Sequence, residues 1–240
     1  MHPAMKVIKS GRNGPTRDIG HLDATLENAM NATVKSPAPS HRERLLKEGL
    51  RSFYATGFHG TSVDELLAAA EAPKGSFYHH FGSKDEFAKA VIAEYSAAQM
   101  ALLDKFASRE DLTAYQKIIA YFETLLGRFE RSQHKVGCLV GKFSTELAPS
   151  SDAFSAILAE SMKDWRAGLA KITQEGHRDG SIRTDMPAGQ QAVLLLSLIQ
   201  GSLVVALAER NHDSLTAVRA SLPKLLSARY GTPSRATAGK

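Results

Sequence analysis

The sequence predicts an all-α protein of about nine helices, and three observations support that prediction. Alanine and leucine are abundant, whereas aromatic residues make up only 7% of the 240 residues. Apolar residues recur at spacings of three and four along most of the chain, framed by residue types that begin and end helices. No segment shows the strict alternation that is typical of a half-buried strand. A hydrophobic share of 43% with 23% charged residues is ordinary for a globular protein and excludes wholesale disorder.

The N-terminal part of the folded region is predicted to hold four helices. Ser40 is a favourable N-cap, and the helix that it opens should end at Gly57. Ser62, with Glu65 three residues later, forms a capping box for the second helix. A second capping box, residues 83–86, opens the long fourth helix. The predicted helices are 41–56, 63–71, 76–81 and 84–107, with a turn at 72–75.

Five further helices are expected in the remainder of the chain. Cys138 lies in a glycine-bracketed junction, and Pro149 should close the short helix that follows it. Ser151 is an N-cap for a long helix that Gly180 should end. The predicted helices are 112–131, 139–147, 152–178, an apolar helix through 192–208, and 213–230.

The second and third helices, with the short turn between them, form a helix-turn-helix. Two short helices joined in this way cross at a steep angle, and the second can enter the major groove of DNA. Lys74 and Ser76 stand at the N-terminal end of this second helix, where free backbone amides favour phosphate. Tyr78 and His79 project from its next turn, and Lys84 is placed to neutralise another phosphate. We therefore expect the protein to bind double-stranded DNA.

At these residues the sequence resembles the TetR/AcrR family of one-component repressors. The resemblance covers roughly residues 40–90 and is carried by Phe58, Gly60 to Val63, Pro73 to Phe81, Ser83 and Lys84. It implies DNA contacts by Ser62, Lys74, Gly75, Ser76, Tyr78, His79 and Lys84. One departure is Glu71, where the family has a glycine in the left-handed region. A non-glycine residue costs about 1 kcal/mol there, so we expect the local turn to differ.

A shorter stretch, Gly137 to Lys142 with Glu146 and Leu147, resembles the branch of acrylate-responsive and N-ethylmaleimide-responsive repressors. Cys138 is the single cysteine, and two hypotheses stay open for it. It is either a small buried apolar residue or a sensor for electrophilic small molecules, because flanking glycines, nearby lysines and a helix start are features of reactive thiols. The residues expected to line an effector pocket, or else to be core, are Phe122, Phe143, Met162 and Trp165.

Several classes of protein and site are disfavoured. A single cysteine rules out an internal disulfide and a multi-cysteine zinc site, and it fits a reducing cytoplasm. His79 and His80 are adjacent on a helix and point about 100° apart, so they are poorly placed to chelate a metal together. No metal or other cofactor is expected. The first 39 residues contain no apolar secretory segment, and the uncharged run 186–208 is interrupted by polar residues. We expect it to be a buried helix rather than a membrane span.

The net charge of +5 permits a polyanionic partner, but it does not come from the helix-turn-helix. Residues 40–95 carry seven Lys and Arg against eight Asp and Glu. Any binding to DNA must therefore depend on the local arrangement of charges. The expected parts are a disordered extension at 1–39, a DNA-binding domain at 40–95, a ligand-binding and dimerisation domain at 96–230, and a disordered tail at 231–240.

Together these observations predict a repressor that leaves a palindromic operator when a small molecule binds its C-terminal domain. We expect a homodimer, because one six-residue reading helix contacts too few bases for specificity. The dimer contact should lie on the helices through 192–208 and 213–230, which carry more apolar surface than a monomer leaves exposed. Two alternatives stay open: an enzyme using Cys138 with His134 as base, and a ligand-independent architectural DNA binder.

Overall fold

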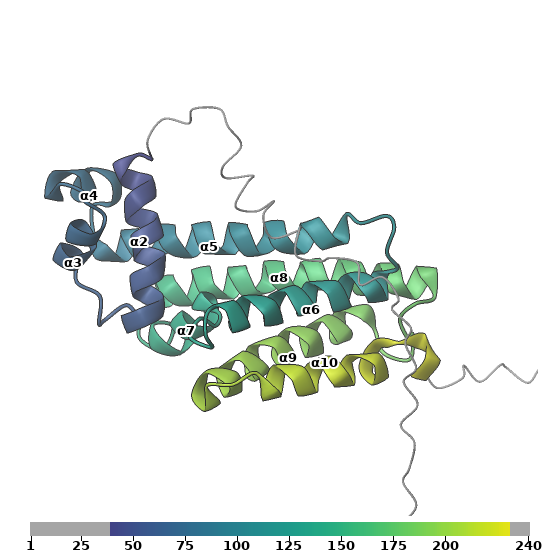
Figure 1. Cartoon of the computed structure of the whole chain (residues 1–240). Helices are drawn as coiled ribbons and strands as arrows, with labels where there is room; N and C mark the ends of the chain where they lie inside the picture. The colour runs from purple at the N-terminus through teal and green to yellow at the C-terminus, as the bar shows by residue number, and fades with distance from the viewer. Residues whose placement is uncertain (1–38, 231–240) are drawn as a thin grey trace, which may run out of the picture. The chain divides into compact units, whose positions relative to one another are not determined.

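The computed structural model describes residues 39–230. The expectations for an extension at 1–39 and a tail at 231–240 therefore lie, Pro39 apart, outside the described residues. Within 39–230 the chain forms nine α-helices and no strand, as predicted (Figure 1). The elements are α2 His41–Thr56, α3 Val63–Ala69, α4 Lys74–Phe81, α5 Lys84–Ala107, α6 Ala114–Arg131, α7 Leu139–Glu146, α8 Asp152–Asp179, α9 Ala188–Glu209, α10 Asp213–Leu226 and the 3₁₀ helix η2 Ala228–Tyr230.

Most helix ends follow the predicted caps. Ser40 and Ser62 form complete capping boxes at the starts of α2 and α3. Gly57 and Gly180 end α2 and α8 at φ angles of 76° and 73°, a region that favours glycine. The predicted capping box at the start of α5 is only half formed. The Ser83 hydroxyl accepts from the backbone amide of Glu86, but the Glu86 carboxylate pairs instead with Lys89.

Several helix boundaries differ from the predictions, and those of α4 and α10 differ for clear local reasons. The helix α4 begins at Lys74 rather than at Ser76, because Pro73 takes an extended conformation and serves as the N-cap. The helix α10 ends at Leu226 rather than at residue 230. Ser227, the next residue, is extended and makes an isolated bridge with Ile182, so the chain leaves the helical path there.

The three short helices α2, α3 and α4, here called the head, pack around the N-terminal part of α5 (Figure 1). Their core is aromatic: the Phe87 ring of α5 lies 5.8 Å from Phe53, 5.2 Å from Phe77 and 4.9 Å from Phe81. A Cβ on Gly49 would lie 2.3 Å from the Phe87 ring, so α2 and α5 approach this closely only because residue 49 is glycine. This packing holds α4 in a fixed position on the head.

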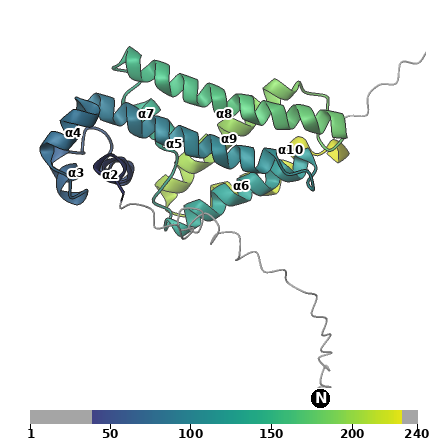
Figure 2. The same cartoon turned by 90° about the horizontal axis from the view of Figure 1, so that it is seen from above.

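The remaining helices form a bundle that continues from α5. The helices α5 and α8 run side by side, and α6 packs against both of them (Figures 1 and 2). The helix α9 lies against α8, and α10 lies against α9 and α6. Because α5 is unbroken from Lys84 to Ala107, it belongs both to the head and to the bundle.

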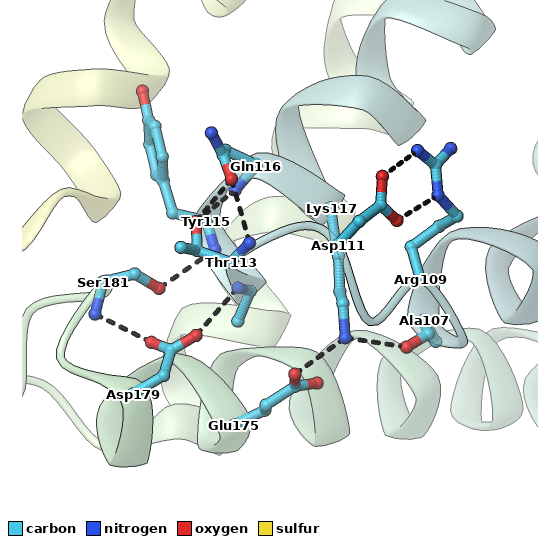
Figure 3. A network of polar contacts seen from close by, with 11 residues as sticks. Ala107, Arg109, Asp111, Thr113, Tyr115, Gln116, Lys117, Glu175, Asp179 and Ser181 are labelled. Carbon is cyan, nitrogen blue, oxygen red and sulfur yellow. Dashed lines mark hydrogen bonds and ion pairs between the residues drawn. The ribbon is translucent and has the colours of Figure 1, made fainter.

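A polar network joins the α5–α6 connection to the C-terminal end of α8 (Figure 3). Thr113 caps α6 in a capping box with Gln116, which is why α6 starts at Ala114 rather than at residue 112. Asp179 accepts hydrogen bonds from the backbone amides of Ala114 and Ser181 at 2.9 and 2.8 Å. Burial opposes ionisation of Asp179, but these hydrogen bonds outweigh it and hold the pKa of the carboxyl below its ordinary value.

At the centre of this network the ammonium group of Lys117 is buried, with 5% of its side chain exposed. It donates to the Glu175 carboxylate at 2.7 Å and to the Ala107 carbonyl at 2.9 Å (Figure 3). Lys117→Met should lower the free energy of unfolding by about 2 kcal/mol, because it leaves both acceptors without this donor. Urea denaturation measures the change. Lys163→Met breaks an exposed pair with Glu160 and should cost less than about 0.5 kcal/mol; an equal loss would contradict the assignment.

The helix α9 differs from the buried helix that the sequence predicts. By length and composition alone it could cross a membrane. Less than half of its most apolar stretch is buried in the protein. One face packs on α8 and α10, whereas the opposite face leaves large apolar side chains exposed. These exposed side chains are Val193, Leu194, Val204, Val205 and Leu207.

Candidate nucleic-acid interface and interior polar cluster

The turn between α3 and α4 has the left-handed geometry that was not expected with a glutamate at position 71. Glu71 lies at φ 48°, although it is not glycine. The Arg44 guanidinium donates to the carbonyl of Ala70 at 2.9 Å and to that of Glu71 at 3.0 Å. These charge-assisted hydrogen bonds satisfy carbonyls at the end of α3 and offset the cost of the strained residue. The expectation of a different turn is therefore wrong, because Arg44 supports the usual one.

The outer face of α4 exposes the side chains predicted to contact DNA. Tyr78 is 48% exposed and His79 is exposed, whereas the preceding residue, Phe77, is fully buried. Gly75 has no atom within 4 Å of where a Cβ would lie, so its backbone faces open space. No side chain caps the first turn of α4, which leaves its amide end open to an anion.

The other predicted DNA contacts surround this face. Lys74 is exposed and pairs with Asp64 at 3.2 Å, and Ser76 is half-buried. Ser62 is exposed at the start of α3, where its hydroxyl accepts from the Glu65 amide. The Lys84 ammonium lies 4.5 Å from the centre of the Phe58 ring, a cation–π contact that orients it. The Ser62 hydroxyl keeps its own O–H to donate, so it suits phosphate, as do the positive groups and the open amides of α4.

Inside the bundle, polar side chains from four helices surround the start of α7. We call Tyr54, Tyr95, Gln99, Tyr121, Cys138 and Trp165 the interior polar cluster. Cys138 is 8% exposed and is the N-cap of α7, where its Sγ accepts from the Gly141 amide at 3.3 Å. Burial raises the pKa of the Tyr54, Tyr95 and Tyr121 hydroxyls well above the ordinary value, and the neighbouring Cys138 raises it further. These hydroxyls therefore stay protonated and can donate hydrogen bonds.

Some polar atoms of this cluster have no hydrogen-bond partner among the described residues. They are Gln99 Oε1, Tyr121 Oη and Trp165 Nε1, joined by Gln200 Nε2 from α9. Tyr121 Oη and Trp165 Nε1 are neighbours, and their contact partly offsets the rise in the pKa of the tyrosine hydroxyl. A cavity beside Gln99 and Trp165 measures about 10 Å³, room for at most one water molecule. Its lining residues are Tyr95, Ser96, Gln99, Met100, Val140, Ser161 and Trp165.

Of the residues predicted to line an effector pocket, Trp165 is found at this cavity and Phe143 is not. Phe143 is fully buried and packs edge-on against Phe53 of α2, 5.2 Å between ring centres. Phe122 is buried in the core, and Met162 packs partly buried against it. The polar residues of α5 at this cavity were not predicted, although Ser96 and Gln99, three residues apart, interrupt an otherwise apolar face.

The two residues of the enzyme alternative have different neighbours. The His134 ring lies 5.2 Å from the Phe129 ring and 5.6 Å from that of His212, whereas the Cys138 thiol accepts from the Gly141 amide. This arrangement gives no support to a catalytic pair of Cys138 and His134. Within residues 39–230 there is also no group of three or more side chains that could hold a metal ion.

Comparison with known proteins adds an independent finding for both parts of the chain. Residues 45–91 match the model described as bacterial regulatory proteins, tetR family. Residues 114–222 match the model described as tetracyclin repressor-like, C-terminal domain.

Individual relatives are similar over most of their length. The transcriptional repressor DhaR of Mycobacterium sp. (strain GP1) is 32% identical over 174 residues, 72% of this chain and 86% of DhaR. The reduced form of Escherichia coli NemR is a similar solved structure, with a TM-score of 0.72 and 30% identity over 78% of this chain and 97% of that chain. A regulatory protein TetR from Rhodobacter sphaeroides has the same TM-score at 27% identity, covering 76% and 97% of the two chains.

Proposed function

The chain belongs to the TetR family of helix-turn-helix transcriptional repressors, and from this premise we propose how its residues hold an operator. The exposed face of α4 enters the major groove, where Tyr78 and His79 reach the bases and the nearest phosphates. Lys74, Gly75 and Ser76 offer their amide end and one positive charge to phosphate. Ser62 and Lys84 contact the backbone on either side. The observation that carries this proposal is the open, exposed first turn of α4 above a fully buried aromatic core.

Lys84→Ala should weaken binding to operator and to random DNA about equally and make the salt dependence shallower by about one unit, because a phosphate contact carries no sequence information. His79→Ala should instead reduce the preference for operator over random DNA. Fluorescence anisotropy at several salt concentrations measures both. Lys171→Ala, on the exposed surface of α8, is the matched control and should change neither quantity. An unchanged salt slope in Lys84→Ala would contradict this placement of Lys84.

We further propose that residues 40–95 act as the DNA-binding domain and residues 96–230 as the domain for ligand binding and dimerisation. The exposed apolar face of α9 is the surface for a second copy of the chain. Together with α10 it would build a four-helix contact about a two-fold axis. Operator palindromy would then mirror the symmetry of the dimer. A cytoplasmic location follows from the proposed partner, operator DNA.

The interior polar cluster is the proposed site of a small-molecule effector. A cavity of about 10 Å³ is too small for any organic ligand, so an effector can bind only when the surrounding helices move. The effector therefore prefers a different conformation from the one described, and this preference, about 1–3 kcal/mol in comparable systems, is what can release DNA.

We propose that the effector is an electrophile that reacts with Cys138. The thiolate would add to the β-carbon of an α,β-unsaturated carbonyl compound: a C–S bond forms, the C=C electron pair moves to the α-carbon, and that carbon takes a proton from water. A reversible ligand is the alternative. The unpartnered Trp165 Nε1 and Tyr121 hydroxyl favour a ligand with a hydrogen-bond acceptor in that case.

A further inference from the structure

The helix α7 presents one face to the last turn of α2. Lys142 and Glu146 follow Cys138 at intervals of four residues, so all three lie on the same side of α7. Phe143, next to them, packs on Phe53 of α2. One end of this short helix therefore belongs to the interior polar cluster, and the same face extends to the head.

Lys142 ties α7 to the end of α2. Its ammonium donates to the backbone carbonyl of Tyr54 at 2.7 Å. Tyr54 lies in the last four residues of α2, where helix carbonyls lack a partner from their own helix. A positive charge is also favourable at a helix C-terminus, so this contact satisfies the carbonyl and the helix dipole together.

Glu146 ties α7 to the loop that follows α2. Its carboxylate accepts from the backbone amide of His59 at 2.9 Å. A Cβ on Gly57 would lie 2.7 Å from the same carboxylate, so the glycine lets the acid pack directly on the backbone. This loop leads into Ser62 and α3, the first helix of the helix-turn-helix.

Tyr54 takes part both in the interior polar cluster and in the contact between α7 and α2. Its ring lies 6.2 Å from the Tyr95 ring in the interior polar cluster, and its carbonyl holds Lys142. A displacement of α7 would thus move the last turn of α2 through Lys142 and the loop after α2 through Glu146, in each case by a charged contact with a backbone atom. Neither contact involves a residue of α5, the helix that runs from the head into the bundle.

We propose that Lys142 and Glu146 are positioning residues that set the orientation of the DNA-reading head by holding the backbone at Tyr54 and His59. The inference rests on the proposed function, because it assumes that operator binding requires one orientation of the head. Loss of either contact should weaken operator binding without weakening the electrostatic attraction to DNA. Neither side chain needs to touch DNA for this effect.

The test compares disruptive variants with conservative ones. The DNA is a duplex that the wild-type protein selects from a random-sequence library, with an unselected duplex of equal length beside it. Lys142→Met and Glu146→Ala should each weaken binding to the selected duplex about tenfold and to the unselected duplex less than about twofold. Lys142→Arg and Glu146→Gln keep a donor and an acceptor, and both should restore most of the affinity. Lys171→Met and Glu94→Ala, at exposed positions on α8 and α5, are the matched controls.

Three results would overturn the inference. The first is wild-type affinity for the selected duplex in both disruptive variants. The second is an equal loss for selected and unselected DNA together with a lower melting temperature, since this would show general damage to the fold. The third is failure of the conservative variants to restore affinity. If the wild-type protein selects no duplex at all, the proposed function fails as well, and this outcome is distinct from the other three.

Discussion

Val204→Glu should convert the protein into a monomer and weaken operator binding by about a hundredfold or more. Val204 is 63% exposed on α9, the most exposed of the large apolar residues of the described chain. A carboxylate in the middle of an apolar contact would lose its water without gaining a partner. A monomer then contacts a single half-site. It loses the high effective concentration that a dimer has at the second half-site once its first head is bound.

Size-exclusion chromatography with light scattering measures the mass at micromolar concentration, where the wild-type protein should show twice the chain mass of 26.0 kDa. Ala167→Glu places the same charge on the exposed surface of α8 and should leave the dimer intact. A dimeric Val204→Glu protein would refute the assignment of this face. A monomeric wild-type protein would refute the dimer altogether.

Local chemistry explains why so much of the helical pattern could be predicted. Ser40, Ser62 and Ser151 cap the helices that were expected to begin there, and Gly57 and Gly180 end theirs. Each of these signals acts within one helical turn, so the sequence contains it directly. The start of α4 was predicted two residues too late, because proline can serve as an N-cap without any side-chain hydrogen bond.

Contacts between distant segments could not be predicted from spacing. Arg44 supports the turn at Glu71 from 27 residues away, and Lys142 reaches Tyr54 across 88 residues. From the sequence alone, Lys142 cannot be distinguished from other lysines on exposed helix faces. Only the packing of α7 against α2 shows that this lysine reaches a backbone carbonyl of the head. Phe143 illustrates the same limit: its apolar character predicts burial, but not that it packs against the head rather than at the cavity.

The proposed DNA-binding face was more accessible to sequence reasoning than the interior polar cluster. Its residues lie in one continuous segment, so the placement of α4 brings Lys74, Tyr78 and His79 to one surface. The cluster draws one or two residues from each of several helices. Tyr121 and Trp165 come from α6 and α8, and single aromatic residues on amphipathic helices are normally core.

Cys138→Ser should abolish the release of operator by electrophiles while leaving operator affinity in their absence unchanged. The wild-type protein, treated with N-ethylmaleimide or an acrylate-like compound, should lose the operator. Serine is nearly isosteric with cysteine and is a preferred N-cap, so its hydroxyl can accept from the Gly141 amide as Sγ does. The variant therefore removes the nucleophile and preserves the start of α7.

The expected difference is large because an adduct cannot fit into the described conformation. Cys138 is 8% exposed, and the cavity lined by Tyr95 and Trp165 of the same cluster measures about 10 Å³ and holds at most a water molecule, so any adduct must displace neighbouring helices. Mass spectrometry of the intact protein should show one adduct per chain, since the chain contains one cysteine. Release of operator from the serine variant by the same compounds would exclude covalent sensing at Cys138. Trp165→Phe would then test the reversible alternative, because it removes the unpartnered Nε1 donor while keeping an aromatic ring beside the cavity.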